Sequence, residues 1–167
     1  MKKLLLPLFL SVLISCEKEP LHTDTESKNV FSISSSEKGK TYQIRVYLPA
    51  DYLQSSDYYP TIYVLDADEN EKFVANECKK ASESLHTQNA IVIGINYGDN
   101  RDVDYTPTVT DYGKGGSEAF MKFIKNELIP RIENDYRADK QRKSRTILGH
   151  SFGGLLGAYA FTKFNEV

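Results

Sequence analysis

Residues 146–161 read TILGHSFGGLLGAYAF, and this stretch decides the fold. A short apolar run leads into Gly149-His150-Ser151-Phe152-Gly153-Gly154, and a second apolar run follows it. This order predicts a strand, a sharp turn and a helix. It is the context of a GxSxG turn, which holds the serine hydroxyl out at the end of a sheet in a strained backbone conformation. Because the chain passes close to itself there, we expect a Cβ at Gly149 or Gly153 to clash.

Ser151 is therefore the candidate nucleophile. A serine attacks a carbonyl only when a neighbouring base takes its proton, and that base is usually a histidine oriented by a carboxylate. The developing oxyanion needs two backbone N–H donors. Phe152 is expected to supply one, and the turn after an earlier central strand the other, with Ala67 as first candidate and Asp68 as second. The alternative for residues 149–154 is a glycine-rich helix start that only packs against a sheet.

None of the three histidines is placed to act as the base for Ser151. In such a fold the acid and the histidine follow the serine along the chain. After Ser151 the sequence holds one acid, Glu166, and no histidine. His22 lies in a polar stretch, His86 at a predicted helix end, and His150 in the turn itself, where neighbouring side chains diverge. We expect a packed or hydrogen-bonded structural role for His150, so the chain is interpreted as the front part of an enzyme.

The strand before the turn leads to a second expectation. A strand that carries the nucleophile is central in an α/β sheet, but no later segment can pair with residues 144–148 on their outer side. They would form an exposed apolar edge, which favours aggregation. We therefore expect the 167-residue chain alone to be catalytically inert and poorly soluble.

Composition indicates one globular domain. Hydrophobic residues make up 40% of the chain and charged residues 26%, and the formal net charge is −2. These values argue against disorder and give no reason to expect nucleic-acid binding.

The N-terminus reads as a lipoprotein signal. Residues 1–15 combine a basic start with an apolar core too short to span a bilayer. Leu13-Ile14-Ser15-Cys16 resembles the bacterial lipobox, so we expect a lipid on Cys16 to anchor the protein to a membrane of the bacterial envelope, in the periplasm or at the surface. The alternative is an ordinary cleaved signal peptide with an incidental cysteine. Residues 16–29 are polar and predict a flexible tether, which leaves residues 30–167 as the partial folded domain.

The strands of this domain follow from side-chain alternation and apolar runs. Residues 41–48 alternate as a half-buried strand does, and residues 30–34 can pair with them across Lys38-Gly39. Residues 61–65 and 90–95 are continuous apolar runs that suit strands covered on both faces. Strands alternating with helices predict a mostly parallel sheet with helices on both faces.

Two further helices are predicted between the strands. From Glu69 on, apolar residues recur at helical spacing, and Asp68 can cap this helix. Ser117 can cap a second helix, which Pro130 should kink or interrupt. The apolar positions are Val74, Cys78, Ala81 and Leu85 in the first helix, and Phe120, Phe123, Ile124, Leu128 and Ile132 in the second. Cys78 has no partner for a disulfide apart from Cys16 and is interpreted as a buried core thiol.

Four segments carry a family resemblance: residues 62–68, residues 100–107 (NRDVDYTP), residues 127–133 and the GxSxG turn. Together they resemble the α/β-hydrolase superfamily, and within it the esterase group of siderophore esterases and esterase D-like enzymes. The turn is specific to the superfamily, and Arg-x-x-Asp-Tyr-Thr-Pro narrows the resemblance to this group. It implies an α/β-hydrolase three-layer sandwich whose C-terminal part, with the acid and the histidine, is missing here.

The resemblance also implies roles for the long loop at residues 98–116. In relatives this loop borders the active site, so Arg101 and Tyr105 are expected to contact the substrate. The alternative is that Arg101 and Asp104 only hold the loop together.

The functional hypothesis is a serine esterase without cofactor or metal ion, acting on a small-molecule ester such as a siderophore lactone or an acylated saccharide. A peptidase or thioesterase on the same fold is a close variant. Asp66 and Asp68 suggest a metal site only weakly, because neither a histidine nor a third oxygen cluster accompanies them. The alternative from another class is a non-catalytic envelope lipoprotein that uses this fold to bind a ligand or partner.

Overall fold

The computed structural model describes residues 29–97 and 101–164 of the protein. The predicted signal peptide, Cys16, His22, Glu166 and nearly all of the predicted tether lie outside the described residues. Asn29, the last residue assigned to the tether, already belongs to the first strand and pairs with Val46.

The described residues form one five-stranded sheet in the order β1-β2-β4-β3-β5. The strands are β1 (Asn29–Ser35), β2 (Lys40–Tyr47), β3 (Thr61–Leu65), β4 (Ile91–Ile95) and β5 (Arg145–Leu148). β1 and β2 form an antiparallel hairpin, and β2 is antiparallel to β4. β3 is parallel to both β4 and β5. The predicted strands are confirmed, and the parallel part of the sheet contains the predicted buried runs.

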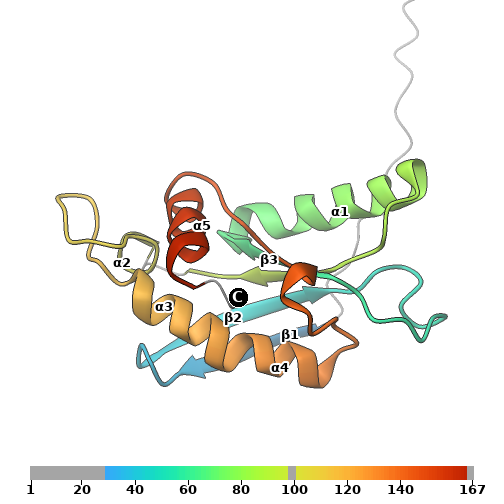
Figure 1. The fold of residues 1–167 in the computed structure, drawn as a ribbon, viewed down its shortest axis with the longest axis horizontal. Helices are drawn as coiled ribbons and strands as arrows, with labels where there is room; N and C mark the ends of the chain where they lie inside the picture. Colours follow the sequence, from blue (N-terminus) through green and yellow to red (C-terminus); the bar gives the residue numbers. More distant parts are fainter. Residues whose placement is uncertain (1–28, 98–100, 165–167) are drawn as a thin grey trace, which may run out of the picture.

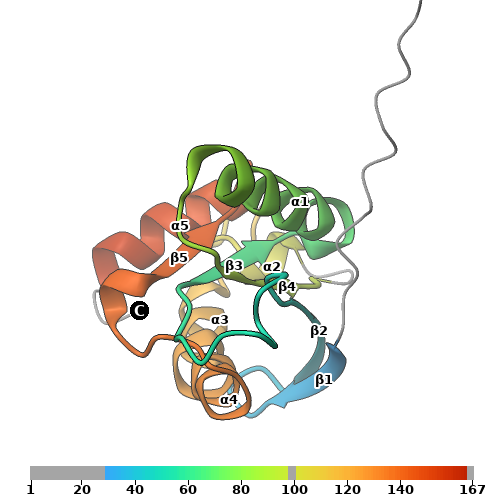
Figure 2. The same cartoon turned by 90° about the vertical axis from the view of Figure 1, so that its right-hand side faces the viewer.

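Helices cover both faces of this sheet (Figures 1 and 2). α1 (Ala67–Leu85) packs on one face. α3 (Ser117–Phe123), the π-helical segment η1 (Ile124–Leu128) and α4 (Ile129–Asp135) form one continuous rod on the other. α5 (Phe152–Lys163) buries Leu156 and Ala160 in the same core as this rod. A four-residue helix, α2 (Arg101–Asp104), lies in the predicted long loop. The predicted three-layer α/β arrangement is confirmed.

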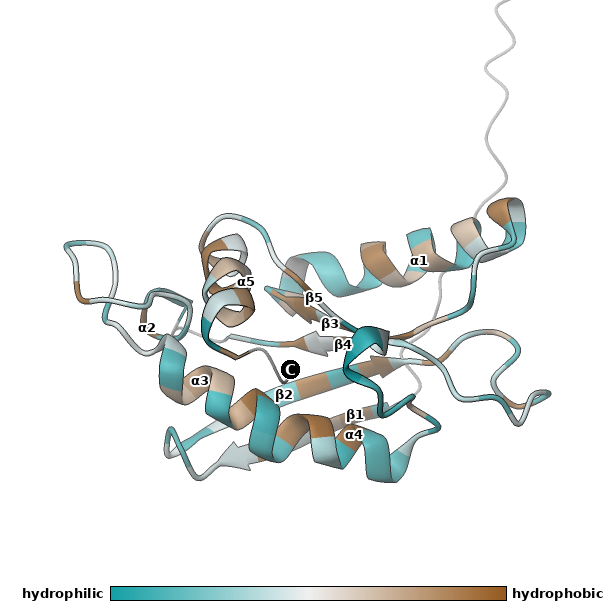
Figure 3. Ribbon diagram, viewed as in Figure 1, coloured by the Kyte–Doolittle hydropathy of each residue, from teal (hydrophilic) through white to brown (hydrophobic). Residues whose placement is uncertain are grey.

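The helix periodicity is visible along the rod, where apolar and polar residues alternate (Figure 3). Its predicted apolar face is fully buried against the sheet and comprises Phe120, Phe123, Ile124, Leu128 and Ile132. In α1, Val74 is buried as expected, whereas Leu85 is 71% exposed, because it lies in the last turn beyond the sheet. Exposed His86 ends α1 in a left-handed conformation, which agrees with the predicted helix end.

Pro130 interrupts the helix bonding in the predicted way. Proline has no N–H to donate to the preceding turn. Directly before it, the N–H of Ile129 reaches back five residues to the carbonyl of Ile124, and the helix widens into η1. The rod continues through α4 without ending.

Two predicted helix caps are wrong. Ser117 is the first residue of α3, is fully buried and makes no capping bond, whereas Gly116 occupies the N-cap position. The N–H of Gly116 donates to the carbonyl of Val103 at 2.8 Å, which fixes the chain one residue earlier than expected. α1 likewise begins at Ala67, so Asp68 lies inside the helix and Asp66 precedes it.

The edge of the sheet at β5 is open, as the sequence predicts. β5 is the outermost strand in the described part of the chain. Next to it, α5 leaves Leu155 44% and Phe161 80% exposed. A strand edge flanked by exposed apolar side chains is a template for self-association.

None of the described helices combines the length and the apolar character needed to cross a membrane.

We predict that Phe161→Lys raises the soluble, monomeric fraction of the 167-residue chain, because it places a charge beside the open edge. Analytical ultracentrifugation of the wild type and the variant measures this. Val109 is the matched control, since it is 79% exposed but lies in the loop after α2. An equal gain from Val109→Lys would contradict the assignment of self-association to β5 and α5.

Candidate active site

Ser151 occupies a strained turn between β5 and α5. Its backbone has φ 55° and ψ −117°, a region that residues with a Cβ seldom adopt. Such a conformation costs about 1–3 kcal/mol and persists only where the surroundings enforce it. Ser151 is exposed to solvent, and its carbonyl accepts the N–H of Leu155 at 3.0 Å. The structure therefore presents the hydroxyl-bearing residue at the corner where the sequence predicts it.

Gly149 is required by a close approach. A Cβ built on it would lie 2.6 Å from the backbone carbon of Gly153, a separation that real structures do not tolerate. For Gly153 the expectation is wrong, because the nearest atom to its Cβ would be Oδ2 of Asp66 at 3.4 Å. A Cβ on Gly153 would point toward Leu65 and Asp66 and make ordinary van der Waals contacts there, so of these two glycines only Gly149 is sterically enforced.

The N-termini of α1 and α5 lie at the carboxyl end of the parallel strands, where Ser151 also lies. β3 and β5 run parallel side by side, with Val64 opposite Leu148. β3 leads through Asp66 into α1, and β5 leads through residues 149–151 into α5. Ala67 and Phe152 are the first residues of these helices. The first N–H groups of a helix have no acceptor within it and carry partial positive charge. This arrangement suits a developing negative charge beside Ser151.

Arg101 connects the two turns. Its Nε and Nη2 donate to the two carboxylate oxygens of Asp66 at 2.8 and 3.0 Å. The same Nη2 also donates to the carbonyl of His150 at 3.0 Å. The hydrogen bond with Asp66 raises the pKa of the guanidinium, which therefore stays charged. The side chain of His150 is exposed, so the packed or hydrogen-bonded role predicted for its imidazole is wrong, and the residue contributes its backbone carbonyl to this link.

Tyr105, for which the resemblance implied a substrate contact, is buried in the described part of the chain. Its side chain is fully buried, and its hydroxyl accepts the backbone N–H of Asp66 at 3.1 Å. Burial raises the pKa of the phenol, so the hydroxyl remains neutral. The family resemblance places the loop near the site, but the aromatic ring turns inward to complete the core, where it packs against Phe120. Tyr105 thus supports the turn before α1.

Asp104 anchors the loop, as the alternative interpretation of the motif proposed. Its buried carboxylate forms an ion pair with Lys38 at 2.8 Å and accepts the hydroxyl hydrogen of Tyr42 at 2.8 Å. Lys38 and Tyr42 belong to the hairpin of β1 and β2. The contacts of Asp104 therefore fix α2, which contains Arg101, to the β1–β2 hairpin.

The carboxylate of Asp68, instead of capping α1, forms a hydrogen bond with a residue that follows β4. Its Oδ1 accepts the side-chain amide of Asn96 at 2.6 Å. Among residues 29–97 and 101–164, no group of three or more histidine, cysteine, aspartate or glutamate side chains is arranged to hold a metal ion.

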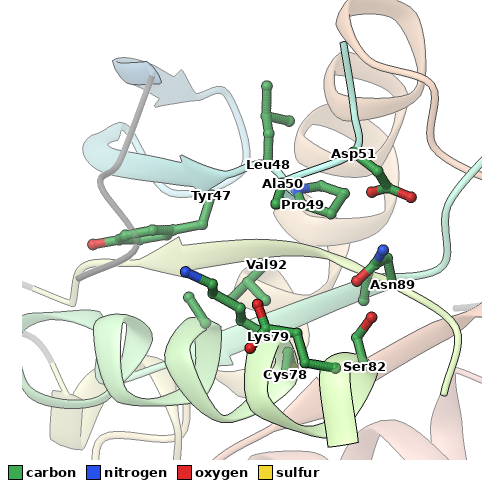
Figure 4. Close-up of a pocket in the computed structure, with 13 residues that line it drawn as sticks. Tyr47, Leu48, Pro49, Ala50, Asp51, Cys78, Lys79, Ser82, Asn89 and Val92 are labelled. Atoms are coloured by element: carbon green, nitrogen blue, oxygen red, sulfur yellow. The ribbon is translucent and has the colours of Figure 1, made fainter. Parts of the chain in front are cut away.

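The structure contains a pocket of about 270 Å³ (Figure 4). Its walls are the segment after β2, the second half of α1 and the residues just before β4. Because β4 is parallel to β3 and β3 to β5, the start of β4 lies at the edge of the sheet opposite Ser151. Cys78 is half-buried in this wall rather than fully buried, and burial raises the pKa of its thiol. The pocket is separate from the candidate active site.

Comparison with known proteins identifies the family. Residues 35–166 match the family described as "Putative esterase". The chain belongs to this esterase family. Its fold is that of the α/β-hydrolases, in agreement with the three-layer arrangement above.

Curated relatives of this esterase-family chain share about a third or less of its residues. The ferri-bacillibactin esterase BesA of Bacillus subtilis is 32% identical over 162 residues, which cover 80% of this chain and 55% of BesA. The siderophore triacetylfusarinine C esterase of Aspergillus fumigatus is 28% identical, over 77% of this chain and 49% of its own length. The chain spans about half the length of the curated relatives it matches.

Solved structures agree with the sequence comparison. The IroE-like serine hydrolase of Shewanella oneidensis superposes with a TM-score of 0.72 at 30% identity, over 79% of this chain and 45% of that one. The BES protein of Bacillus cereus superposes with a TM-score of 0.73 at 29% identity, over 89% of this chain and 63% of that one.

Sequence reasoning missed Asp66 as part of the site. It predicted this residue only as a weak metal ligand, whereas the structure places it in the left-handed region, 3% exposed, with both carboxylate oxygens bound by Arg101. One signal was available: aspartate tolerates left-handed turns and directly follows a buried strand here.

Proposed function

We propose that this chain carries the nucleophile and the oxyanion hole of a serine esterase that works through an acyl-enzyme. The observation that carries the proposal is the backbone of Ser151, strained at φ 55° and ψ −117° at the end of a strand that lies beside β3. Strain of this kind has no role in a helix start that merely packs against a sheet, and it is the geometry of a nucleophile elbow.

In this mechanism the Oγ of Ser151 attacks the ester carbonyl, and the N–H groups of Phe152 and Ala67 bind the resulting oxyanion. Such preorganised donors are worth about 3–4 kcal/mol each in comparable enzymes. Collapse of the tetrahedral intermediate releases the alcohol and leaves an acyl group on the serine. Water then attacks this acyl group and regenerates the hydroxyl. A histidine and an acid that move the protons would come from the region corresponding to the other half of the relatives.

The proposed substrates are siderophore esters. Three curated relatives have names that describe them as esterases of bacillibactin, triacetylfusarinine C and salmochelin. The family match at residues 35–166 includes both the strained turn and the Arg101 loop. Acylated saccharides are the second substrate class to test.

Hydrolysis by the full gene product tests this function. We expect turnover of a siderophore lactone and of p-nitrophenyl acetate, and much slower turnover of the corresponding amides, because an amide needs a protonated leaving group. A folded gene product that binds the siderophore but turns over none of these esters would support the non-catalytic alternative instead.

We also propose that a lipid on Cys16 anchors the protein to a membrane of the bacterial envelope. The lipobox-like tetrad at residues 13–16 supports this. Radiolabelled palmitate is expected to enter the wild-type protein and not a Cys16→Ser variant. Equal labelling of both, or of neither, would exclude the anchor.

A further inference from the structure

We infer that Arg101 is a positioning residue that locks together the two turns carrying the proposed oxyanion donors. The inference rests on the proposed function and adds to it a residue that determines the rate without touching the reacting atoms.

The contacts of one guanidinium join both turns. Asp66, bound through two hydrogen bonds of 2.8 and 3.0 Å, directly precedes Ala67. His150, whose carbonyl is bound at 3.0 Å, lies two residues before Phe152. The two proposed donors are therefore linked through a single planar group. Movement of either turn would break at least one of these hydrogen bonds.

Further contacts stiffen this link. The guanidinium carbon lies 5.4 Å from the ring centre of Phe152 and 5.9 Å from that of Tyr105, within the range of cation–π attraction. The hydroxyl of Tyr105 holds the backbone N–H of Asp66. Asp66 is thus restrained through both its backbone and its side chain, which accounts for how a non-glycine residue is kept at φ 56°.

Most of the guanidinium is committed to the protein, since three of its five N–H donors are used in the hydrogen bonds with Asp66 and His150. Nε and Nη2 of Arg101 already donate to three acceptor oxygens. The side chain of Arg101 is 28% exposed, and the Asp66 side chain that it binds is 4% exposed. Lysine cannot replace this fork, because an ammonium group is a point charge without fixed planar donors.

This role predicts a specific kinetic signature. The oxyanion develops in the transition state and the tetrahedral intermediate and is absent from the bound substrate, so misplaced donors lower kcat and leave KM nearly unchanged. Loss of a substrate contact would raise KM instead.

The test uses Arg101→Gln and Arg101→Lys in the full gene product, with Arg45→Gln as matched control. Arg45 binds Glu71 of α1 at 2.7 Å, and the two side chains are 31% and 6% exposed, close to the values for Arg101 and Asp66. It lies on β2, two strands away from β3. We expect both Arg101 variants to lose about 10- to 100-fold in kcat and in the rate of Ser151 phosphonylation by a fluorophosphonate, at unchanged KM. Arg45→Gln should shift Tm by a similar amount and keep its kcat.

The other outcomes separate this inference from the proposed function. An active wild type with unchanged kcat in Arg101→Gln, or with a raised KM alone, would overturn the positioning role and leave the esterase proposal standing. Equal losses of kcat in Arg45→Gln would also overturn it, since the effect would then be general destabilisation. A wild type without turnover and without labelling refutes the esterase proposal and the inference with it. Should Arg101→Gln not fold, Arg101→Lys and Asp66→Asn give the same readouts.

Discussion

Replacing Ser151 with alanine is expected to lower ester hydrolysis by the full gene product by about 10⁴- to 10⁶-fold, the range seen when a serine nucleophile is removed. The folded state should hardly change, because the residue is exposed and its side chain supports no packing. We expect the free energy of unfolding to stay within about 0.5 kcal/mol of the wild type. Initial rates with p-nitrophenyl acetate and a thermal melt measure the two effects.

Ser56 provides the control, because it is an exposed serine in the polar segment before β3. Ser56→Ala should retain full activity. A Ser151→Ala variant that keeps more than about a tenth of the wild-type rate would show that another group performs the attack, since nucleophile removal in such enzymes costs far more.

Replacing Gly149 with alanine should lower kcat/KM by at least about 100-fold, because the added Cβ would lie 2.6 Å from the backbone of Gly153 and must push the turn apart. The same strain should cost about 1–3 kcal/mol of folding free energy. Steady-state kinetics and urea denaturation measure both losses.

Gly157 is the matched control in the helix that follows. A Cβ at this position would meet nothing within 4 Å. Gly157→Ala should therefore keep its activity and gain up to about 1 kcal/mol through helix propensity. If Gly149→Ala were as active as Gly157→Ala, the close approach within the turn would have no functional meaning.

The local pattern was sufficient to predict the strand–turn–helix corner at Ser151. Its information lies within a few consecutive residues, where a glycine-rich turn separates one apolar run from the next. The buried strands and the apolar face of the α3–α4 rod were predictable for the same reason, since their periodicity is local.

The links between the turns were not predictable in this way. Arg101 and Asp66 are separated by 35 residues, and only the topology of the sheet brings them together. The direction of the Tyr105 side chain also depends on the packing of the loop, so a resemblance that places the loop near the site could not tell substrate contact from core packing. The N-cap of α3 was mispredicted because the tertiary contact between Gly116 and Val103 overrides the capping preference of Ser117.

Peptide mapping of the full gene product after treatment with a fluorophosphonate tests the central claim most directly. The reagent phosphonylates a serine that is both activated and placed before an oxyanion hole. We expect a single adduct, on the peptide that contains Ser151. A folded protein that carries no adduct, or one that is modified at another residue, would contradict it.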